Sequence, residues 1–335
     1  MTSVNKLGAQ EEAEVLQSMR LLSFEGLASK YSDLSNYCLV QHLGSGKYSD
    51  VFEGIDRRDN EHVAIKVLKP VSKRKIRREI KILETLRGGV NIVMLKEVVS
   101  NPVTLTLALV MELTYPTDFS DIYLELNDFH IRYYIYELLK ALDYCHAHGI
   151  MHRDVKPYNI VVDHEAMKLR LIDFGLAEFY RSGEEYSLHV ASRHYKGPEL
   201  LVGYSCYSYS LDIWSMGCML ATMIFRKEPF FNGKNDVDQL VRITDVLGAT
   251  DLLSWIYEYK IDFHPTPDQE FTCASRKEWT HFKNAYNEHL AKEDALDFLD
   301  RVLVFDPQKR ITASDAMKHA YFAPVRDELK PSECS

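Results

Sequence analysis

The chain has 335 residues, of which 46% are hydrophobic and 27% charged, and its formal net charge is −9 at pH 7. This composition is typical of a soluble globular protein with a sizeable core, and the length suits two packed lobes around a shared cleft. The acidic balance argues against a surface that binds nucleic acid or anionic lipid throughout, so we expect any recognition of polyanions to be local.

The N-terminus and the cysteines bear on where the protein works. The first residues, MTSVNKLGAQEEAE, lack the basic and apolar stretches of a secretory signal, and the longest apolar-leaning run, residues 103–113, is too short for a bilayer. The six cysteines show neither C-x-x-C pairs nor metal-ligand spacing, which is typical of free thiols in a reducing compartment. We therefore expect a protein of the cytoplasm, the nucleus or both, with no membrane contact.

Strand patterns fill the chain between residue 37 and about residue 114. Residues 1–36 are expected to form an N-terminal extension with one candidate amphipathic helix, residues 11–22. Beyond it, runs rich in β-branched and apolar side chains alternate with turn residues, which predicts strands around a single helix at residues 75–87. The predicted strands are residues 37–43, 50–56, 62–68, 92–99 and 106–113.

Helical patterns dominate after about residue 118. Apolar residues recur there every three or four positions, with one exception, a short β pair within residues 159–173. The predicted helices are residues 130–149, 211–225, 237–248 and 293–303. These patterns predict an α+β architecture with a small β-rich lobe, about residues 37–114, a larger helical lobe, about residues 115–322, and a tail, residues 323–335.

Residues 43–51, LGSGKYSDV, connect two predicted strands. Gly44 and Gly46 would let the backbone approach phosphate oxygens closely, with amide groups as donors. A G-x-G stretch alone is more often a plain turn, and a strand follows here where a dinucleotide-binding motif requires a helix. The stretch therefore supports a phosphate site only in combination with residues further along the chain.

Lys66 lies in the apolar strand VAIKV, where a buried ammonium needs an anionic partner. At 100° per residue, Glu79 falls near the centre of the apolar helix face that contains Ile80 and Leu83. An unpaired carboxylate in that position is costly. We therefore predict an ion pair between Lys66 and Glu79.

Two short motifs, HRDVKPYN and the downstream DFG, complete the set. Asp154 is placed to accept the proton of a substrate hydroxyl, and Lys156 to neutralise a transferring phosphoryl group. Asn159 and Asp173 are oxygen ligands that suit Mg²⁺ bound to nucleotide phosphates. Each residue could be an ordinary loop residue alone, but their order and spacing together indicate phosphoryl transfer.

These motifs resemble those of eukaryotic protein kinases over roughly residues 37–322. The resemblance implies a bilobal kinase fold, with ATP and Mg²⁺ as cofactors, and Lys156 marks the Ser/Thr type of catalytic loop. The residues with implied catalytic roles are Lys66, Glu79, Asp154 and Lys156. The implied nucleotide site consists of Leu43, Gly44, Ser45, Gly46, Lys47, Tyr48, Ser49, Asp50, Val51, Ala64, Lys66, Met111, Glu112, Thr114 and Ile172.

Longer stretches, among them LKALDYCHAHGIMHRDVKP, VASRHYKGPELL and MIFRKEPFF, resemble the catalytic (alpha) subunit family of casein kinase II. That resemblance implies a constitutively active kinase for Ser or Thr followed by acidic residues. It also implies a dimeric regulatory (beta) subunit that docks on the outer face of the β-rich lobe and completes a heterotetramer. The candidate docking residues, which could equally be plain core, are Tyr37, Leu39, Phe52, Ile65 and Val67.

Basic side chains concentrate at two places in this acidic chain. Five lie in the six positions from Lys73 to Arg78, and a second group lies just before the GPE motif. Charge-assisted contacts from both groups would select acidic peptides. The candidate substrate-binding residues are Lys73, Arg74, Lys75, Arg77, Arg78, His189, Arg193 and Lys196. A solvated face or a nuclear-localisation patch is the alternative interpretation of the basic run.

Some residues depart from the casein kinase II pattern. His189 stands where the family has arginine, and residues 1–36 do not match the N-terminal segment that braces the activation loop in the family. Ala64 and Met111 replace bulkier residues at the adenine pocket. This last difference argues against GTP as an alternative to ATP.

A related kinase that needs phosphorylation of its activation loop is one alternative. Residues 173–199 contain no Thr, but Tyr180, Tyr186 and Tyr195 remain as candidate sites. Glu184 and Glu185 could supply negative charge to Arg153 in place of a phosphate. A pseudokinase scaffold would lack catalytic residues that are all present here, and a nucleic-acid-binding module would need aromatic residues within the basic run. We therefore expect an active kinase with no direct nucleic-acid contact.

Overall fold

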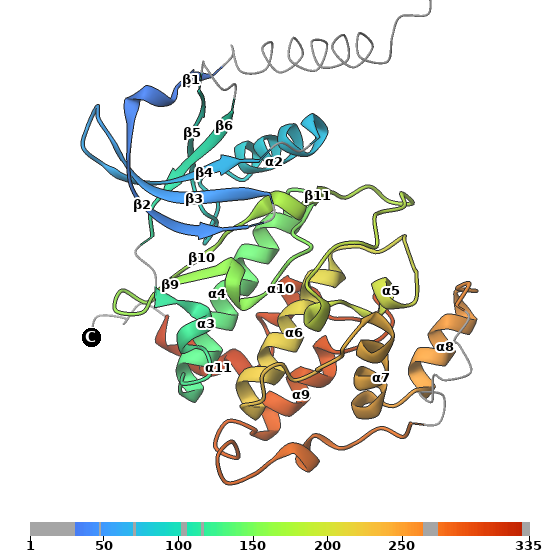
Figure 1. Ribbon diagram of the computed structural model, residues 1–335. Coiled ribbons are helices and arrows are strands. Elements are labelled where there is room, and N and C mark those ends of the chain that lie inside the picture. The colour runs from blue at the N-terminus through green and yellow to red at the C-terminus, as the bar shows by residue number, and fades with distance from the viewer. Residues whose placement is uncertain are drawn as a thin grey trace, which may run out of the picture. The chain divides into compact units, whose positions relative to one another are not determined.

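Figure 1 shows the computed structural model, which describes residues 31–46, 48–69, 72–101, 106–114, 117–263 and 274–329. The candidate helix at residues 11–22 and the predicted site residue Lys47 lie outside the described residues. The chain divides into two compact units. The sheet unit comprises Met1–Ile80 and Met94–Leu113, and the helical unit comprises Lys81–Val93 and Thr114–Ser335.

A six-stranded sheet forms the centre of the sheet unit. Its strands are β1 Ser32–Asp33, β2 Tyr37–Ser45, β3 Ser49–Asp56, β4 His62–Leu68, β5 Leu95–Ser100 and β6 Leu107–Glu112. They lie in the order β1-β5-β6-β4-β3-β2, and all neighbours pair antiparallel except β1, which runs parallel to β5. The sequence pattern did not predict β1, because two residues are too few to show an alternation.

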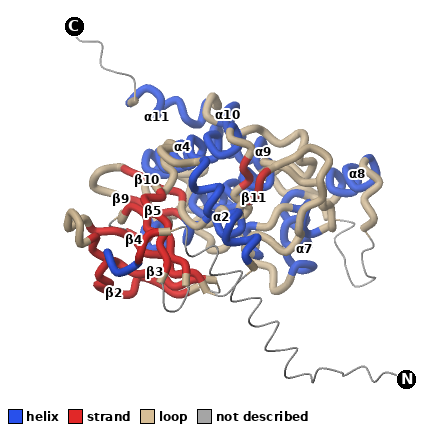
Figure 2. Tube along the Cα trace, turned by 90° about the horizontal axis from the view of Figure 1, so that it is seen from above, coloured by secondary structure: helices blue, strands red, loops and turns tan. Residues whose placement is uncertain are grey.

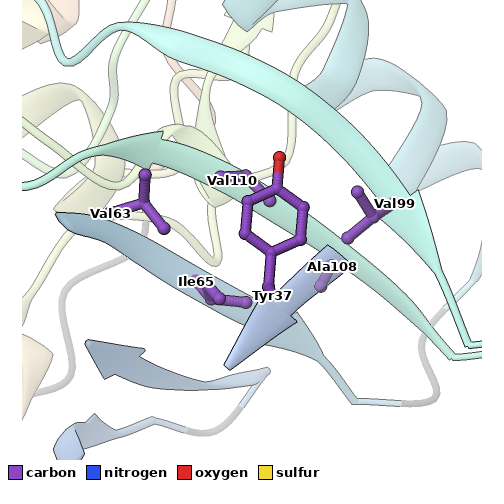
Figure 3. Packing of buried hydrophobic residues seen from close by; sticks show 6 residues of the cluster. All are labelled: Tyr37, Val63, Ile65, Val99, Ala108 and Val110. Atoms are coloured by element: carbon purple, nitrogen blue, oxygen red, sulfur yellow. The ribbon is translucent and has the colours of Figure 1, made fainter. Parts of the chain in front are cut away.

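One face of this sheet carries a cluster of buried apolar side chains (Figure 3). Successive side chains of a strand point to opposite faces, so Ile65 of β4 joins this cluster while the adjacent Lys66 points to the other face. The cluster consists of Tyr37, Val63, Ile65, Val99, Ala108 and Val110. Tyr37 and Ile65 are only 6% and 0% exposed, so these two candidate docking residues belong to the core.

Helix α2, Lys73–Thr85, forms where the sequence predicts the helix of the β-rich lobe. Its apolar residues Ile76, Ile80 and Leu83 are at most 4% exposed, whereas Arg74 and Arg77 are exposed. The 3.6-residue repeat of apolar side chains gives the helix one buried face and leaves its basic residues to the solvent.

The helical unit contains nine described helices and five short strands. The helices are α3 Phe119–Ile122, α4 Asp128–Ala147, α5 Pro198–Leu201, α6 Ser210–Phe225, α7 Asp236–Leu247, α8 Thr250–Glu258, α9 Glu293–Val302, α10 Ala313–Ala316 and α11 Ala323–Glu328. The strands are β7 Thr117–Asp118, β8 Ile150–Met151, β9 Ile160–Asp163, β10 Lys168–Leu171 and β11 Glu178–Phe179. The pair β9–β10 is the β pair that the sequence predicts.

Helix α6 lies in the core of the helical unit, where every one of its residues is buried. Helices α4 and α9 both contact it. Figure 2 shows α4, α7 and α9 among the helices of this unit and β2 to β5 among the strands of the sheet unit. A β-rich unit and a helical unit confirm the predicted α+β class.

Two features of the described residues bear on where the protein works: the lengths of the apolar helices and the state of the cysteines. None of the helices found there is long and apolar enough to cross a membrane. The cysteines found there are free thiols, as the sequence predicts. They are Cys38, Cys145, Cys206 and Cys218.

Candidate active site

Lys66 and Glu79 form the predicted ion pair within the sheet unit. The Lys66 Nζ atom lies 2.7 Å from Glu79 Oε1, and the two side chains are only 8% and 9% exposed. The lysine comes from β4, and the glutamate comes from the buried face of α2. Each charge would be costly to bury alone, so the two groups stay in contact. The glutamate therefore fixes the position of the lysine ammonium.

The hairpin between β2 and β3 holds the glycine-rich stretch. Gly46 N donates a hydrogen bond to Ser49 O at 2.8 Å, which closes the turn. A Cβ atom at Gly44 would have no neighbour within 4 Å, so the backbone there is open to a ligand. The sequence reasoning did not include Lys69, whose Nζ donates to Gly46 O at 2.8 Å and lies 2.9 Å from Asp50 Oδ1.

Lys69 and its neighbours hold the turn in shape. Hydrogen bonds from Ser45 and Lys69 lower the pKa of the Asp50 carboxyl below its usual range. The ring centroid of Tyr48, in the same hairpin, lies 5.3 Å from the Lys75 ammonium. A cation directly after the end of β4 is the sequence signal that could have indicated Lys69.

The other predicted nucleotide residues lie on neighbouring strands. In the sheet unit, Ala64 of β4 pairs with Met111 of β6, and Val51 of β3 pairs with Lys66 of β4. Glu112 Oε1 accepts a hydrogen bond from Met94 N at 2.9 Å. The sheet unit thus contains Leu43, Gly44, Ser45, Gly46, Tyr48, Ser49, Asp50, Val51, Ala64, Lys66, Met111 and Glu112, and the helical unit contains Thr114 and Ile172.

Asp154 is the centre of a hydrogen-bond network within the helical unit. Its Oδ2 accepts from Lys156 Nζ at 2.7 Å and from Asn159 Nδ2 at 2.9 Å, while its Oδ1 accepts from Ser192 Oγ at 3.2 Å. Lys156 Nζ also donates to Ser192 Oγ at 2.9 Å. Asp154 is 6% exposed, so the surrounding groups fix its orientation. The sequence reasoning did not include Ser192, because nothing in its local spacing connects it to Asp154.

Asp212 of the buried helix α6 positions this loop. Its Oδ2 accepts from His152 N at 2.9 Å and from His146 Nε2 at 2.9 Å, and its Oδ1 accepts from Arg153 N at 2.7 Å. Burial raises the pKa of Asp212. The hydrogen bond and charge of His146, the charge of His152 and the hydrogen bond from Arg153 together outweigh burial, so the pKa lies below its usual range. An ionised Asp212 can therefore hold Arg153 in its left-handed conformation, with φ at 67°.

The Arg153 guanidinium has its partners within the helical unit. Its Nε donates to Leu176 O at 2.8 Å, its Nη1 donates to Tyr207 Oη at 3.0 Å, and its Nη2 lies 3.6 Å from Glu178 Oε2. Glu178 thus provides the carboxylate that was expected from Glu184 or Glu185. Glu184 pairs with the exposed Arg181 at 3.3 Å, and Glu185 is exposed. Glu178 lies on β11, and its pairing with β8 brings this carboxylate close to the catalytic loop.

Asn159 and Asp173 present oxygen atoms that fit a divalent cation. The Asn159 amide nitrogen donates to Asp154 O at 2.8 Å as well as to Asp154 Oδ2, which leaves its oxygen as an acceptor for a ligand. Asp173 is exposed, and its backbone is left-handed with φ at 58°. Ile172 N donates to Asn159 O at 2.9 Å, so the two candidate ligands lie in adjacent segments. Carboxylate and amide oxygens are ligands that Mg²⁺ accepts.

The predicted substrate-binding residues lie in two segments, one in each unit. On α2, Arg74, Lys75 and Arg77 are exposed, and Lys73 and Arg78 are half-buried. Burial and the charge of Arg77 lower the pKa of Lys73.

The second segment lies in the helical unit. His189 and Arg193 are exposed there. Lys196 differs from them, because its Nζ is 2.6 Å from Asp236 Oδ2. The segment continues into α5, where the buried Glu199 pairs with Arg310 at 2.9 Å.

Residues 37–322 match the family model of the protein kinase domain. This match covers more than half of the chain and includes all the motifs described above. Protein kinases use ATP and a divalent metal ion and act on protein substrates. The chain therefore belongs to the protein kinase family and is an enzyme that transfers phosphoryl groups to proteins.

Proposed function

We propose that the protein is a Ser/Thr protein kinase of the casein kinase II type, which phosphorylates Ser or Thr followed by acidic residues. The observation that carries this proposal is the network of Asp154, Lys156 and Ser192 described above. A lysine two residues after the candidate base, in contact with its carboxylate, is the feature that favours a Ser/Thr over a Tyr substrate.

Each residue has a role that follows from its contacts. Asp154 accepts the proton of the substrate hydroxyl, and the Lys156 ammonium neutralises charge on the transferring phosphoryl group. Lys66, held by Glu79, binds ATP phosphates, and the open backbone at Gly44 lets the glycine-rich turn approach them closely. A divalent cation bound by Asn159 and Asp173 would neutralise further phosphate charge.

The preference for acidic substrates is supported by the charge distribution. The chain carries a net charge of −9, yet the exposed surface of α2 presents Arg74, Lys75 and Arg77 within four positions. Acidic peptides would be repelled by most of an acidic surface and attracted to such a basic segment.

A degenerate Ser-peptide library, phosphorylated with either ATP or GTP, tests the substrate class and the nucleotide together. The expected result is enrichment of Asp and Glu after the phosphorylated Ser, with ATP as the preferred donor. The same library incubated with the Asp154→Asn protein gives the background. Enrichment of basic residues or of Pro after the Ser, or phosphorylation of Tyr peptides alone, would contradict the proposal.

A dimeric regulatory (beta) subunit is a further part of this proposal. Of the candidate docking residues, Phe52 and Val67 are half-buried and Leu39 is 48% exposed, on the edge strand β2. Co-purification with a casein kinase II regulatory subunit should be lost on Leu39→Glu and kept on Val90→Glu, a change at a residue that is 51% exposed in the helical unit. If the wild-type protein binds no such subunit, this part of the proposal is wrong.

A further inference from the structure

The ion pair between Lys196 and Asp236 brings together two segments of the helical unit. The distance between Lys196 Nζ and Asp236 Oδ2 is 2.6 Å, and 40 residues separate the two in the chain. The Lys196 side chain is only 13% exposed, whereas that of Asp236 is 53% exposed. The ammonium is therefore largely withdrawn from solvent, and its anionic partner is at the surface.

The lysine side of the pair is fixed by the buried core. Lys196 follows the short helical turn Arg193–Tyr195, and its N–H donates to Arg193 O at 3.3 Å. Ser215 of α6 donates its hydroxyl to Tyr195 O at 2.7 Å. The next residue, Gly197, has no room for a side chain, because a Cβ atom would lie 2.6 Å from the Glu199 carboxylate.

The aspartate side is fixed by the start of a helix. Asp236 is the first residue of α7, and the preceding Asn235 caps the helix by accepting from Asp238 N at 2.9 Å. Gln239 of the same turn accepts from Gly233 N at 2.9 Å. Both charged side chains therefore extend from backbone that other contacts hold in place.

Asp238 lies in the same helical turn and has different contacts. Its carboxylate accepts from Lys234 N at 2.8 Å and pairs with Arg242 at 3.1 Å. It resembles Asp236 in residue type and in its place near the positive end of the helix dipole. It therefore serves as a matched control for Asp236.

We propose that Asp236 is a specificity-determining residue that competes with acidic substrate side chains for Lys196. The inference rests on the proposed function, which assigns Lys196 to substrate recognition. A carboxylate in contact with an ammonium cancels much of its field, so a substrate carboxylate that approaches Lys196 gains less attraction and meets the repulsion of Asp236. Asp236 thus weakens the preference for an acidic residue at the substrate position that Lys196 contacts.

The test uses Ser peptides in which a single Asp occupies each of the positions that follow the Ser, compared with the all-Ala peptide. The ratio of kcat/KM between the Asp and the Ala peptide is measured for wild type, Lys196→Met, Asp236→Asn and Asp238→Asn. The position at which Lys196→Met lowers the ratio is the one that Lys196 contacts. There, Asp236→Asn should raise the ratio about two- to fivefold, the size expected for a partly exposed ion pair.

Three results separate this effect from others. Asp238→Asn should leave the ratio unchanged, although it removes the same kind of charge from the first turn of α7. The gain from Asp236→Asn should shrink as the salt concentration rises. It should also be smaller in the Lys196→Met background, where the substitution relieves only the repulsion of Asp236. Thermal unfolding of both Asn variants shows whether the loss of a charge at the helix N-terminus changes the fold.

The outcomes also distinguish this inference from the proposed function. If wild type shows no preference for Asp at any position, the proposed substrate class is wrong and the inference falls with it. If wild type prefers Asp but Lys196→Met changes no position, or Asp236→Asn leaves the ratio unchanged or lower, the inference is overturned and the proposed function stands.

Discussion

At the scale of single residues, the pair of Lys66 and Glu79 joins function to stability. Both side chains are less than 10% exposed and lie 2.7 Å apart. Removal of one partner leaves the other charge buried and unpaired, which costs far more than the pair contributes. A second substitution that removes the Glu79 charge should therefore restore stability without restoring catalysis, which separates the two roles of Lys66.

Lys66→Met should abolish phosphoryl transfer and lower the free energy of unfolding by roughly 3–5 kcal/mol, because Glu79 then lacks its cation. The double variant Lys66→Met/Glu79→Leu should recover most of this stability and none of the activity. Denaturant unfolding and a peptide phosphorylation assay measure the two effects. A single Lys66→Met variant as stable as wild type would argue against a buried pair.

Asp154→Asn should lower kcat at least about 100-fold, because a positioned base usually contributes that much. The fold should persist, since an Asn side chain has nearly the same size. Its single oxygen can still accept from Lys156 and Asn159, while its amide nitrogen faces the Ser192 hydroxyl. Circular dichroism and single-turnover kinetics check the two halves of this prediction. More than about a tenth of the wild-type rate in the variant would contradict the assignment of Asp154 as the base.

At the scale of elements, helix α4 and the turn between β9 and β10 bring two histidines together, a contact that the sequence of neither element predicts. His130 of α4 and His164 of the β9–β10 turn have ring centroids 4.8 Å apart in an edge-to-face arrangement. Tyr134 of α4 forms a hydrogen bond with His164 Nδ1 at 2.8 Å. Burial and the charge of His164 lower the pKa of His130.

This contact should make stability depend on pH. The unfolded chain takes up a proton at His130 with an ordinary pKa of about 6.5. The folded protein takes it up less readily, so the free energy of unfolding falls as the pH drops through that value. The melting temperature should therefore decrease less between about pH 8 and about pH 5.5 in His130→Gln than in wild type. An equal decrease in both proteins would refute the prediction.

The exposed face of α2 should carry the preference for acidic substrates. Replacing an acidic residue three positions after the Ser by Ala should lower kcat/KM about 10- to 100-fold in wild type, the equivalent of roughly 1.5–3 kcal/mol in charge-assisted bonds. Arg74→Glu/Lys75→Glu should erase most of this difference and leave KM for ATP nearly unchanged. Lys81→Glu/Arg87→Glu makes the same change in net charge outside the predicted substrate residues. If both double variants keep the acidic preference, the basic run is a solvated face.

At the scale of the whole molecule, regulation depends on what holds the activation segment. Arg153 already has a carboxylate partner, Glu178, and a hydrogen bond to Tyr207. The segment between the catalytic loop and α5 therefore does not need a phosphate to give this guanidinium an acceptor. This arrangement favours a kinase that is active without modification over one that waits for an activating kinase.

Protein produced in bacteria and shown by mass spectrometry to be unphosphorylated should therefore be active, and phosphatase treatment should not change its kcat. Glu178→Gln should lower kcat more than Glu184→Gln, because Glu184 pairs only within an exposed turn, with Arg181. An unphosphorylated wild-type protein without activity would contradict this prediction. Equal effects of the two Gln variants would show that Glu178 does not hold Arg153 in the active arrangement.

The sequence by itself determined those parts of the site whose residues are close in the chain or constrained by the period of one element. The 3.6-residue repeat places Glu79 among Ile80 and Leu83, and the apolar context of β4 buries Lys66, so each charge required the other. Asp154, Lys156 and Asn159 lie within one short loop, where spacing alone brings them together. The α+β class followed from the same periodicities.

The tertiary structure alone decided the contacts between distant segments. Ser192 meets Asp154 across 38 positions of the chain, and Asp236 meets Lys196 across 40. The entropy of closing a loop changes little with its length, so nothing in the sequence spacing favours these partners over nearer ones. The same holds for Tyr37, whose burial depends on which strands lie beside it in the sheet, and pairing between strands is a property of the folded chain.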